Sequence, residues 1–144
     1  MGNLPDPKLL PEFYAFVLPK RLVAWAVDGV LILLLTVLVV VATAFVALAI
    51  APVLAVAINV AYRYVGLVKW SATPGMALMA VELRDARGER LDSTTALFHT
   101  LIYTGASATV ILQVVSVVMM LTSDRRQGLP DVLLGTAMLN RPRD

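Results

Sequence analysis

The sequence has no cysteine and a single histidine among its 144 residues. Without cysteine it can form neither a disulfide nor a thiolate metal site, and one histidine cannot by itself supply a multi-histidine site. Charged residues are scarce at 15%, against about 25% in ordinary soluble domains. The sequence offers no recognisable nucleophile–base pair, phosphate-binding loop or metal-ligand cluster. We therefore expect no enzyme, no cofactor and no bound metal.

The scarce charges leave two long stretches uninterrupted. Residues 29–62 and 93–123 contain no Asp, Glu, Lys or Arg. Each stretch exceeds the roughly 20 apolar residues that cross a bilayer, so the chain is predicted to be an integral membrane protein. The net charge of +2 is then explained by Lys and Arg in the loops beside the spans. The expected partner is the lipid bilayer and not nucleic acid.

The hydrophobic pattern predicts an all-α membrane protein with two transmembrane helices and a third membrane-embedded segment. A single helix over residues 21–64 would measure about 66 Å, which is too long for a hydrocarbon core of about 30 Å. Pro52 favours a break just before it, so we place the two spans at 21–45 and 49–68. Residues 94–122 form the third segment. It either crosses once, or bends near Gly105 and returns as a surface helix followed by a re-entrant one.

The basic residues favour the returning arrangement. If the third segment crosses once, the C-terminal arginines lie opposite the other Lys and Arg residues. If it returns, all twelve Lys and Arg residues share one side, as cytoplasmic loops of membrane proteins usually do. We therefore expect a multi-pass membrane protein with a cytoplasmic N-terminus.

The segments outside the spans are short. Residues 1–19 are predicted to be an interfacial segment whose aromatic residues (Phe13, Tyr14 and Phe16) lie at the headgroup level. Residues 20–140 form the membrane domain and residues 141–144 a tail. Within the domain we expect a turn at Thr73-Pro74-Gly75 and another at residues 85–88. Two short surface strands, 78–83 and 134–139, are expected to pair, and Asp92 or Ser93 to cap the helix that follows.

Asp28 is the charged residue that most needs an explanation, because an Asp inside a span costs about 2.5–3.5 kcal/mol on insertion scales. It is either a proton or cation site or half of a buried ion pair that fixes helix packing, and we favour the ion pair. Arg21 lies seven residues earlier and leans away from it. The expected partners are instead Asn59 and Arg63 of the second span, or Arg125 and Arg126.

His99 lies near the start of the third apolar segment. A histidine there could relay protons near neutral pH. We favour an interfacial histidine that is bonded to backbone or to a lipid phosphate.

Three motifs in this order resemble the RDD family of small bacterial membrane proteins. Arg21 and Asp28 open the first span in R-L-V-A-W-A-V-D, A-T-P-G follows the second span, and Asp131 lies in D-R-R-Q-G-L-P-D-V-L-L-G-T. By position, Arg21, Asp28 and Asp131 match the arginine and two aspartates that name the family. Three other positions depart from its pattern: Met76 and Pro130 replace a basic residue and a His, and His99 stands near a common Arg.

The resemblance implies a transport role, since sodium/proton antiport is attributed to some members. Asp28 would then be the ion-binding or proton-binding carboxylate, with Arg21 and Asp131 as gating or structural charges. Two or three helices cannot enclose an aqueous path by themselves. We therefore expect an accessory or structural subunit that packs against a membrane protein complex or its own copies. The alternative is an oligomeric ion or small-solute transporter of the cation/proton antiport type that uses Asp28.

Overall fold

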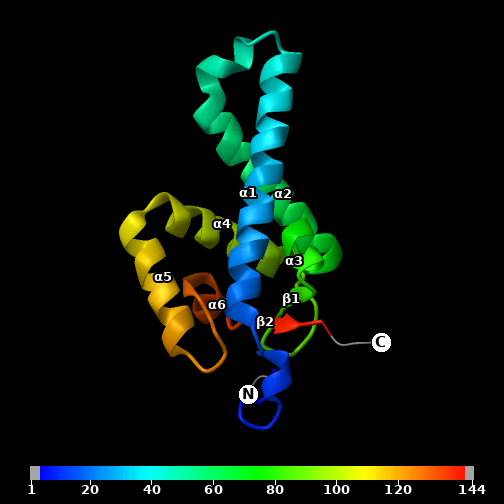
Figure 1. Cartoon of the computed structure of the whole chain (residues 1–144), viewed down its shortest axis with the longest axis vertical. Helices are drawn as coiled ribbons and strands as arrows, with labels where there is room; N and C mark the ends of the chain where they lie inside the picture. Colours follow the sequence, from blue (N-terminus) through cyan, green and yellow to red (C-terminus); the bar gives the residue numbers. More distant parts are fainter. Residues whose placement is uncertain (1–3, 142–144) are drawn as a thin grey trace.

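A helical hairpin stands on a broader base of short helices and a two-stranded sheet in the computed structural model, which describes residues 4–141 (Figure 1). Helix α1 (Val17–Ala42) rises from the base, a short 3-10 helix η2 (Val46–Ile50) reverses the chain, and α2 (Ala51–Trp70) returns behind α1. Pro52 lies in the first turn of α2, where its missing N–H leaves no helical hydrogen bond unmade. The two expected spans are confirmed, and each begins or ends within a few residues of its expected bounds.

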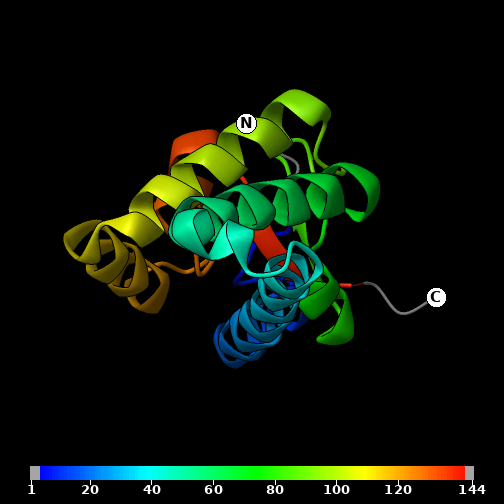
Figure 2. The same cartoon turned by 90° about the horizontal axis from the view of Figure 1, so that it is seen from above.

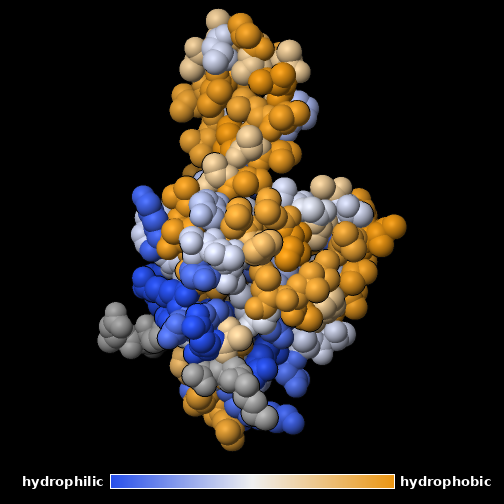
Figure 3. Space-filling view, turned by 180° about the vertical axis from the view of Figure 1, so that it is seen from behind, coloured by the Kyte–Doolittle hydropathy of each residue, from blue (hydrophilic) through white to orange (hydrophobic). Residues whose placement is uncertain are grey.

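Both hairpin helices are long and apolar enough to cross a membrane. At 1.5 Å per residue, α1 measures about 39 Å, which exceeds the hydrocarbon core of about 30 Å. Apolar side chains cover the upper hairpin and polar ones gather around the base (Figure 3). This distribution indicates that the hairpin contacts lipid.

The third apolar segment is two helices rather than one. Helices α4 (Ser93–Ala108) and α5 (Val110–Thr122) meet at Thr109, whose extended backbone turns the chain by 115°. Asp92 caps α4 by accepting a hydrogen bond from the Thr95 N–H. The following short helix α6 (Leu129–Leu134) packs back on α4. The third segment is therefore two helices, as the second alternative expected, although the break falls at Thr109 and not at Gly105. Both a broken span and a re-entrant segment have a bend of this kind.

The base contains a short helix and a two-stranded sheet. Strand β1 (Val81–Arg84) pairs antiparallel with β2 (Ala137–Asn140), with Val81 opposite Asn140. The predicted pairing is confirmed, but both strands are shorter than expected because helices occupy their first residues. Helix α3 (Pro74–Leu78) also replaces the turn expected at Thr73-Pro74-Gly75. Thr73 caps α3 and Pro74 takes its first position, a combination that favours a helix start.

The N-terminal aromatic residues do not all lie at a membrane surface. After the 3-10 helix η1 (Pro11–Phe13), Tyr14 is buried against Ala137 and Leu139 of β2, and its hydroxyl donates to the Pro5 carbonyl at 2.8 Å. Phe16 is exposed. The interfacial prediction is therefore wrong for Tyr14, because the sheet edge offers it an apolar site. Of the predicted tail, residues 142–144 lie outside the described residues.

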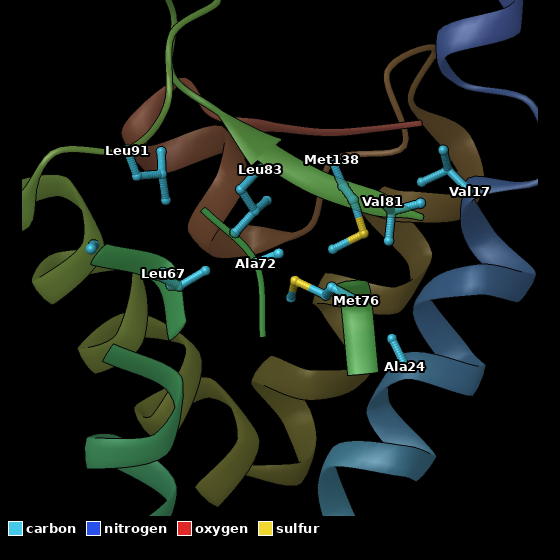
Figure 4. Packing of buried hydrophobic residues seen from close by; sticks show 10 residues of the cluster. Val17, Ala24, Leu67, Ala72, Met76, Val81, Leu83, Leu91 and Met138 are labelled. Atoms are coloured by element: carbon cyan, nitrogen blue, oxygen red, sulfur yellow. The ribbon is translucent and has the colours of Figure 1, made fainter. Parts of the chain in front are cut away.

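A compact apolar cluster joins the base to the helices (Figure 4). Its ten buried members come from α1, α2, α3, α4, both strands and the segments between them: Val17, Ala24, Leu67, Ala72, Met76, Val81, Leu83, Leu91, Ala96 and Met138. Seen from above, α2 and α4 run side by side (Figure 2). The cluster fixes the lower ends of these helices, and this positions the polar side chains described next.

Candidate functional site

The carboxylate of Asp131 is the centre of a largely buried polar cluster. Asp131 lies in the first turn of α6, and its side chain has no exposed surface. Arg21 of α1 approaches Oδ2 at 3.0 Å, and His99 Nε2 of α4 lies 2.8 Å from Oδ1. The Thr136 hydroxyl and the Gly128 N–H each donate to the carboxylate at 3.1 Å. One carboxylate therefore joins α1, α4 and α6.

His99 extends this cluster to α2. If its Nε2 carries the proton and donates to Asp131, its Nδ1 is left as an acceptor. Arg63 Nη2 of α2 lies 3.4 Å from that Nδ1, so one neutral tautomer satisfies both neighbours. The Arg63 guanidinium also lies over the ring of Tyr103, 3.7 Å from its centroid, a favourable cation–π arrangement. Polar contacts thus run continuously from Arg21 through Asp131 and His99 to Arg63.

The environment of Asp131 keeps its carboxyl ionised. Burial raises the pKa of this group, but the positive charge of Arg21 and the hydrogen bond from His99 outweigh burial. The pKa of Asp131 is therefore held well below its usual range. A charged Asp131 is the form that pairs with Arg21.

Asp28 forms a second, separate cluster with the start of α3. Its Oδ1 accepts from the Gly75 N–H at 2.8 Å and from the Tyr62 hydroxyl at 2.8 Å. Its Oδ2 accepts from the Thr73 hydroxyl at 2.5 Å. Asp28 forms no ion pair within residues 4–141. The arginine or asparagine partner expected for it was wrong, because the nearby helix start supplies neutral donors instead.

Gly75 allows this contact because α3 approaches α1 very closely. A Cβ added at Gly75 would lie 2.7 Å from Asp28 Oδ1 and closer still to the carbonyl oxygen of Ala24. Any side chain at this position would push the two helices apart. The Thr-Pro-Gly sequence therefore serves as a helix start that binds a carboxylate.

A cavity of about 60 Å³ lies beside Asp28. The polar residues that line it include Asp28, Asn59, Tyr62, Arg63, Thr73 and Tyr103. Asn59 also donates to Thr104 of α4 at 3.5 Å. A space of this size accommodates a few water molecules or one small polar group.

The structure places most of the candidate residues from the sequence at two sites, the Asp131 cluster and the cavity beside Asp28. Arg21 contacts Asp131, while Asp28, Asn59 and Arg63 line the cavity. His99 is not interfacial but completely buried between Asp131 and Arg63. Arg125 and Arg126 lie in the loop after α5 and do not pair with Asp28.

The sequence did not predict the roles of Tyr62, Tyr103 and Thr136 in these sites. Tyr62 directly precedes Arg63, and Tyr103 follows His99 by one helical turn. For the two tyrosines, the available sequence signal was a polar aromatic residue close to a residue that can carry a buried charge. Thr136 gave none, because its contact depends on how α6 ends.

A family comparison matches this arrangement. The RDD family profile covers residues 17–135, which include both aspartates and their partners except Thr136. The chain belongs to the RDD family. No curated protein and no solved structure gives a match. RDD membership and the two long apolar helices together make the chain a membrane protein.

Two of the three residues that depart from the usual RDD pattern, Met76 and His99, have structural explanations. Met76 is 4% exposed and belongs to the apolar cluster, so a charge there would be buried. His99 stands near a common family arginine and bonds to Asp131. In this RDD protein an imidazole therefore lies beside the buried carboxylate, and Arg21 forms the ion pair with it.

Replacing Gly75 with Ala is expected to destabilise the protein. The added Cβ would clash with Ala24 and Asp28, and overpacking of this kind costs about 1–3 kcal/mol. Thermal unfolding in mild detergent measures the effect. Gly105→Ala is the matched control, because a Cβ at Gly105 in α4 meets nothing within 4 Å. The control should be neutral or stabilising by about 0.5–1 kcal/mol. Equal effects of the two substitutions would contradict the close approach.

Asp131→Asn is expected to lower the free energy of unfolding by about 3–5 kcal/mol, because it leaves Arg21 buried without a counter-charge. The depressed pKa of Asp131 adds a pH dependence to the wild type. Its stabilisation should be fully present above the pKa of an unfolded Asp, about 4, and should be lost as the pH falls toward the lower folded value. Denaturant titrations at several pH values check this. An unchanged acid dependence in Asp131→Asn would contradict it.

Proposed function

We propose that this RDD protein is an accessory or structural membrane subunit that acts by packing against a membrane complex or its own copies. The proposal rests on the contacts that the Asp131 carboxylate makes within the chain. Its carboxylate binds Arg21, His99, Thr136 and Gly128 and is shielded from water. Such a group holds helices together and has no free position for an exchanging ion.

The spans themselves support an assembly role. Only 17% of the most apolar stretch of the first span and 11% of that of the second is buried within the chain. The hairpin therefore presents nearly all of its apolar surface outward. A rigid base that displays such a hairpin suits a subunit that is recognised through its membrane helices.

Co-purification tests this proposal. The chain should be extracted in mild detergent and its mass compared with that of the monomer. The expected result is a fixed ratio to a partner or to further copies of the chain, retained through size exclusion. Cross-linking in intact membranes before extraction provides the control for losses in detergent. A monomer in both experiments would contradict the proposal.

We further propose a multi-pass topology in the bacterial cytoplasmic membrane, with both chain ends and the base in the cytoplasm. The bend between α4 and α5 and the packing of α6 on α4 support it. In this topology all twelve Lys and Arg residues lie on one side of the membrane, in agreement with the positive-inside rule.

Single cysteines can report this topology without background, since the chain has none of its own. Ala49→Cys in the hairpin turn should react with a membrane-impermeant maleimide in intact spheroplasts. Asp124→Cys, in the loop after α5, should react only after permeabilisation. Labelling of both positions in intact spheroplasts would show that the third segment crosses the membrane.

The cavity beside Asp28 favours a second candidate function, a cation or proton transporter that acts as an oligomer. If Asp28 carries ions, purified protein in liposomes should give proton-coupled cation flux, and Asp28→Asn should abolish it. Gly105→Ala provides a helix variant outside the cavity as control. Absence of wild-type flux for Na⁺, K⁺ and Li⁺ would contradict this second function.

A further inference from the structure

Two buried charges of opposite sign line one cavity without forming an ion pair. Arg63 is 6% exposed and Asp28 is 8% exposed, and both border the cavity between α1, α2 and α4. Neither belongs to an ion pair within residues 4–141. Buried charges in proteins are normally paired, so these two require something between them.

Both groups retain hydrogen-bonding capacity. The Arg63 guanidinium contacts His99 through one Nη, while its buried Nε has no hydrogen-bond partner among the described residues. The Asp28 carboxylate accepts three hydrogen bonds of the about four that a carboxylate can accept. The Arg63 N–H groups other than the one that contacts His99, and one acceptor position on Asp28, therefore remain.

The chemistry of the missing partner follows from these charges. A purely anionic ligand would satisfy Arg63 but would meet the negative charge of Asp28. A purely cationic ligand would satisfy Asp28 but would meet Arg63. A small group with an anionic end and an ammonium end satisfies both. Guanidinium binds phosphate well because its planar N–H groups match two phosphate oxygens, and Tyr103 holds that plane in place.

The position of the cavity is suited to a lipid headgroup. Trp25 lines it and is 60% exposed. Exposed tryptophans on membrane helices lie at the headgroup level. A cavity beside Trp25 is therefore accessible to lipid phosphates.

We propose that the cavity between Asp28 and Arg63 binds an aminoalkyl phosphate, with the phosphate on Arg63 and the ammonium on Asp28. The phosphoethanolamine headgroup of a membrane lipid has this chemistry, and free phosphoethanolamine shares it. The site is independent of the subunit role proposed above, since it lies within one chain.

Native mass spectrometry of the full chain tests the site without any substitution. Micelles should contain equal amounts of phosphatidylethanolamine, phosphatidylglycerol and phosphatidylcholine. The wild type should retain one phosphatidylethanolamine in at least about tenfold preference over phosphatidylglycerol, as expected for one hydrogen-bonded charge contact. Phosphatidylcholine, whose ammonium has no N–H, should also bind less. Equal retention of the three lipids would overturn the proposal.

Substitutions then assign the two ends of the ligand. Arg63→Gln should lower phosphatidylethanolamine retention by about tenfold or more. Asp28→Asn should remove the preference over phosphatidylglycerol while the phosphate still binds. Arg126→Gln is the control, because Arg126 lies outside the cavity and donates to the Leu121 carbonyl. Unchanged retention in folded Arg63→Gln would overturn the proposal, and if that variant does not fold, the wild-type lipid ratio decides.

Free phosphoethanolamine distinguishes the source of the ligand. If the lipid is the ligand, millimolar phosphoethanolamine should leave lipid retention unchanged. If the soluble compound is the ligand, it should raise the melting temperature in a manner that depends on Arg63. The first result supports aminoalkyl phosphate binding only if the wild type also shows the expected lipid preference. The second supports it only if the rise in melting temperature depends on Arg63. Failure of both would show that the cavity holds water only.

Discussion

The ion pair between Arg21 and Asp131 is the contact on which the arrangement of the helices depends. Both side chains are largely removed from water, so either one alone would be a buried charge without compensation. Their approach fixes the start of α1 against α6, and His99 carries the same constraint into α4 and on to Arg63 of α2. The chain bends between α4 and α5, and α6 packs on α4 where Asp131 meets His99.

The carboxylates of Asp131 and Asp28 differ in how completely their charges are compensated by the chain. Around Asp131, donors from the chain occupy the carboxylate completely, which supports a framework role. Around Asp28, neutral donors from Tyr62, Thr73 and Gly75 leave the negative charge uncompensated. The cavity that Asp28 shares with Arg63 is therefore where we place a ligand. The proposed subunit role and the proposed lipid site are compatible, because a headgroup bound in this cavity would stabilise the same helices, α1, α2 and α4.

Local signals in the sequence were enough to predict much of the fold. Long uncharged stretches gave the hairpin, Asp92 the start of α4, and the basic loops favoured a returning third segment. The partner of Asp28 was not predictable in this way, because it depends on α3 packing against α1 at Gly75, a contact between distant segments. His99 was misplaced for the same reason. Its polarity indicated an interface, whereas Asp131, far along the chain, supplies a buried partner.

A double-mutant cycle on Arg21 and Asp131 is the most direct test of this account. The free energy of unfolding would be measured for the wild type, Arg21→Gln, Asp131→Asn and the double variant under one detergent condition. We expect each single substitution to be strongly destabilising and the double variant to be much less destabilised than the sum of the two, with a coupling of about 2 kcal/mol or more. Additive effects would contradict it, because they would mean that these charges do not hold α1 to α6.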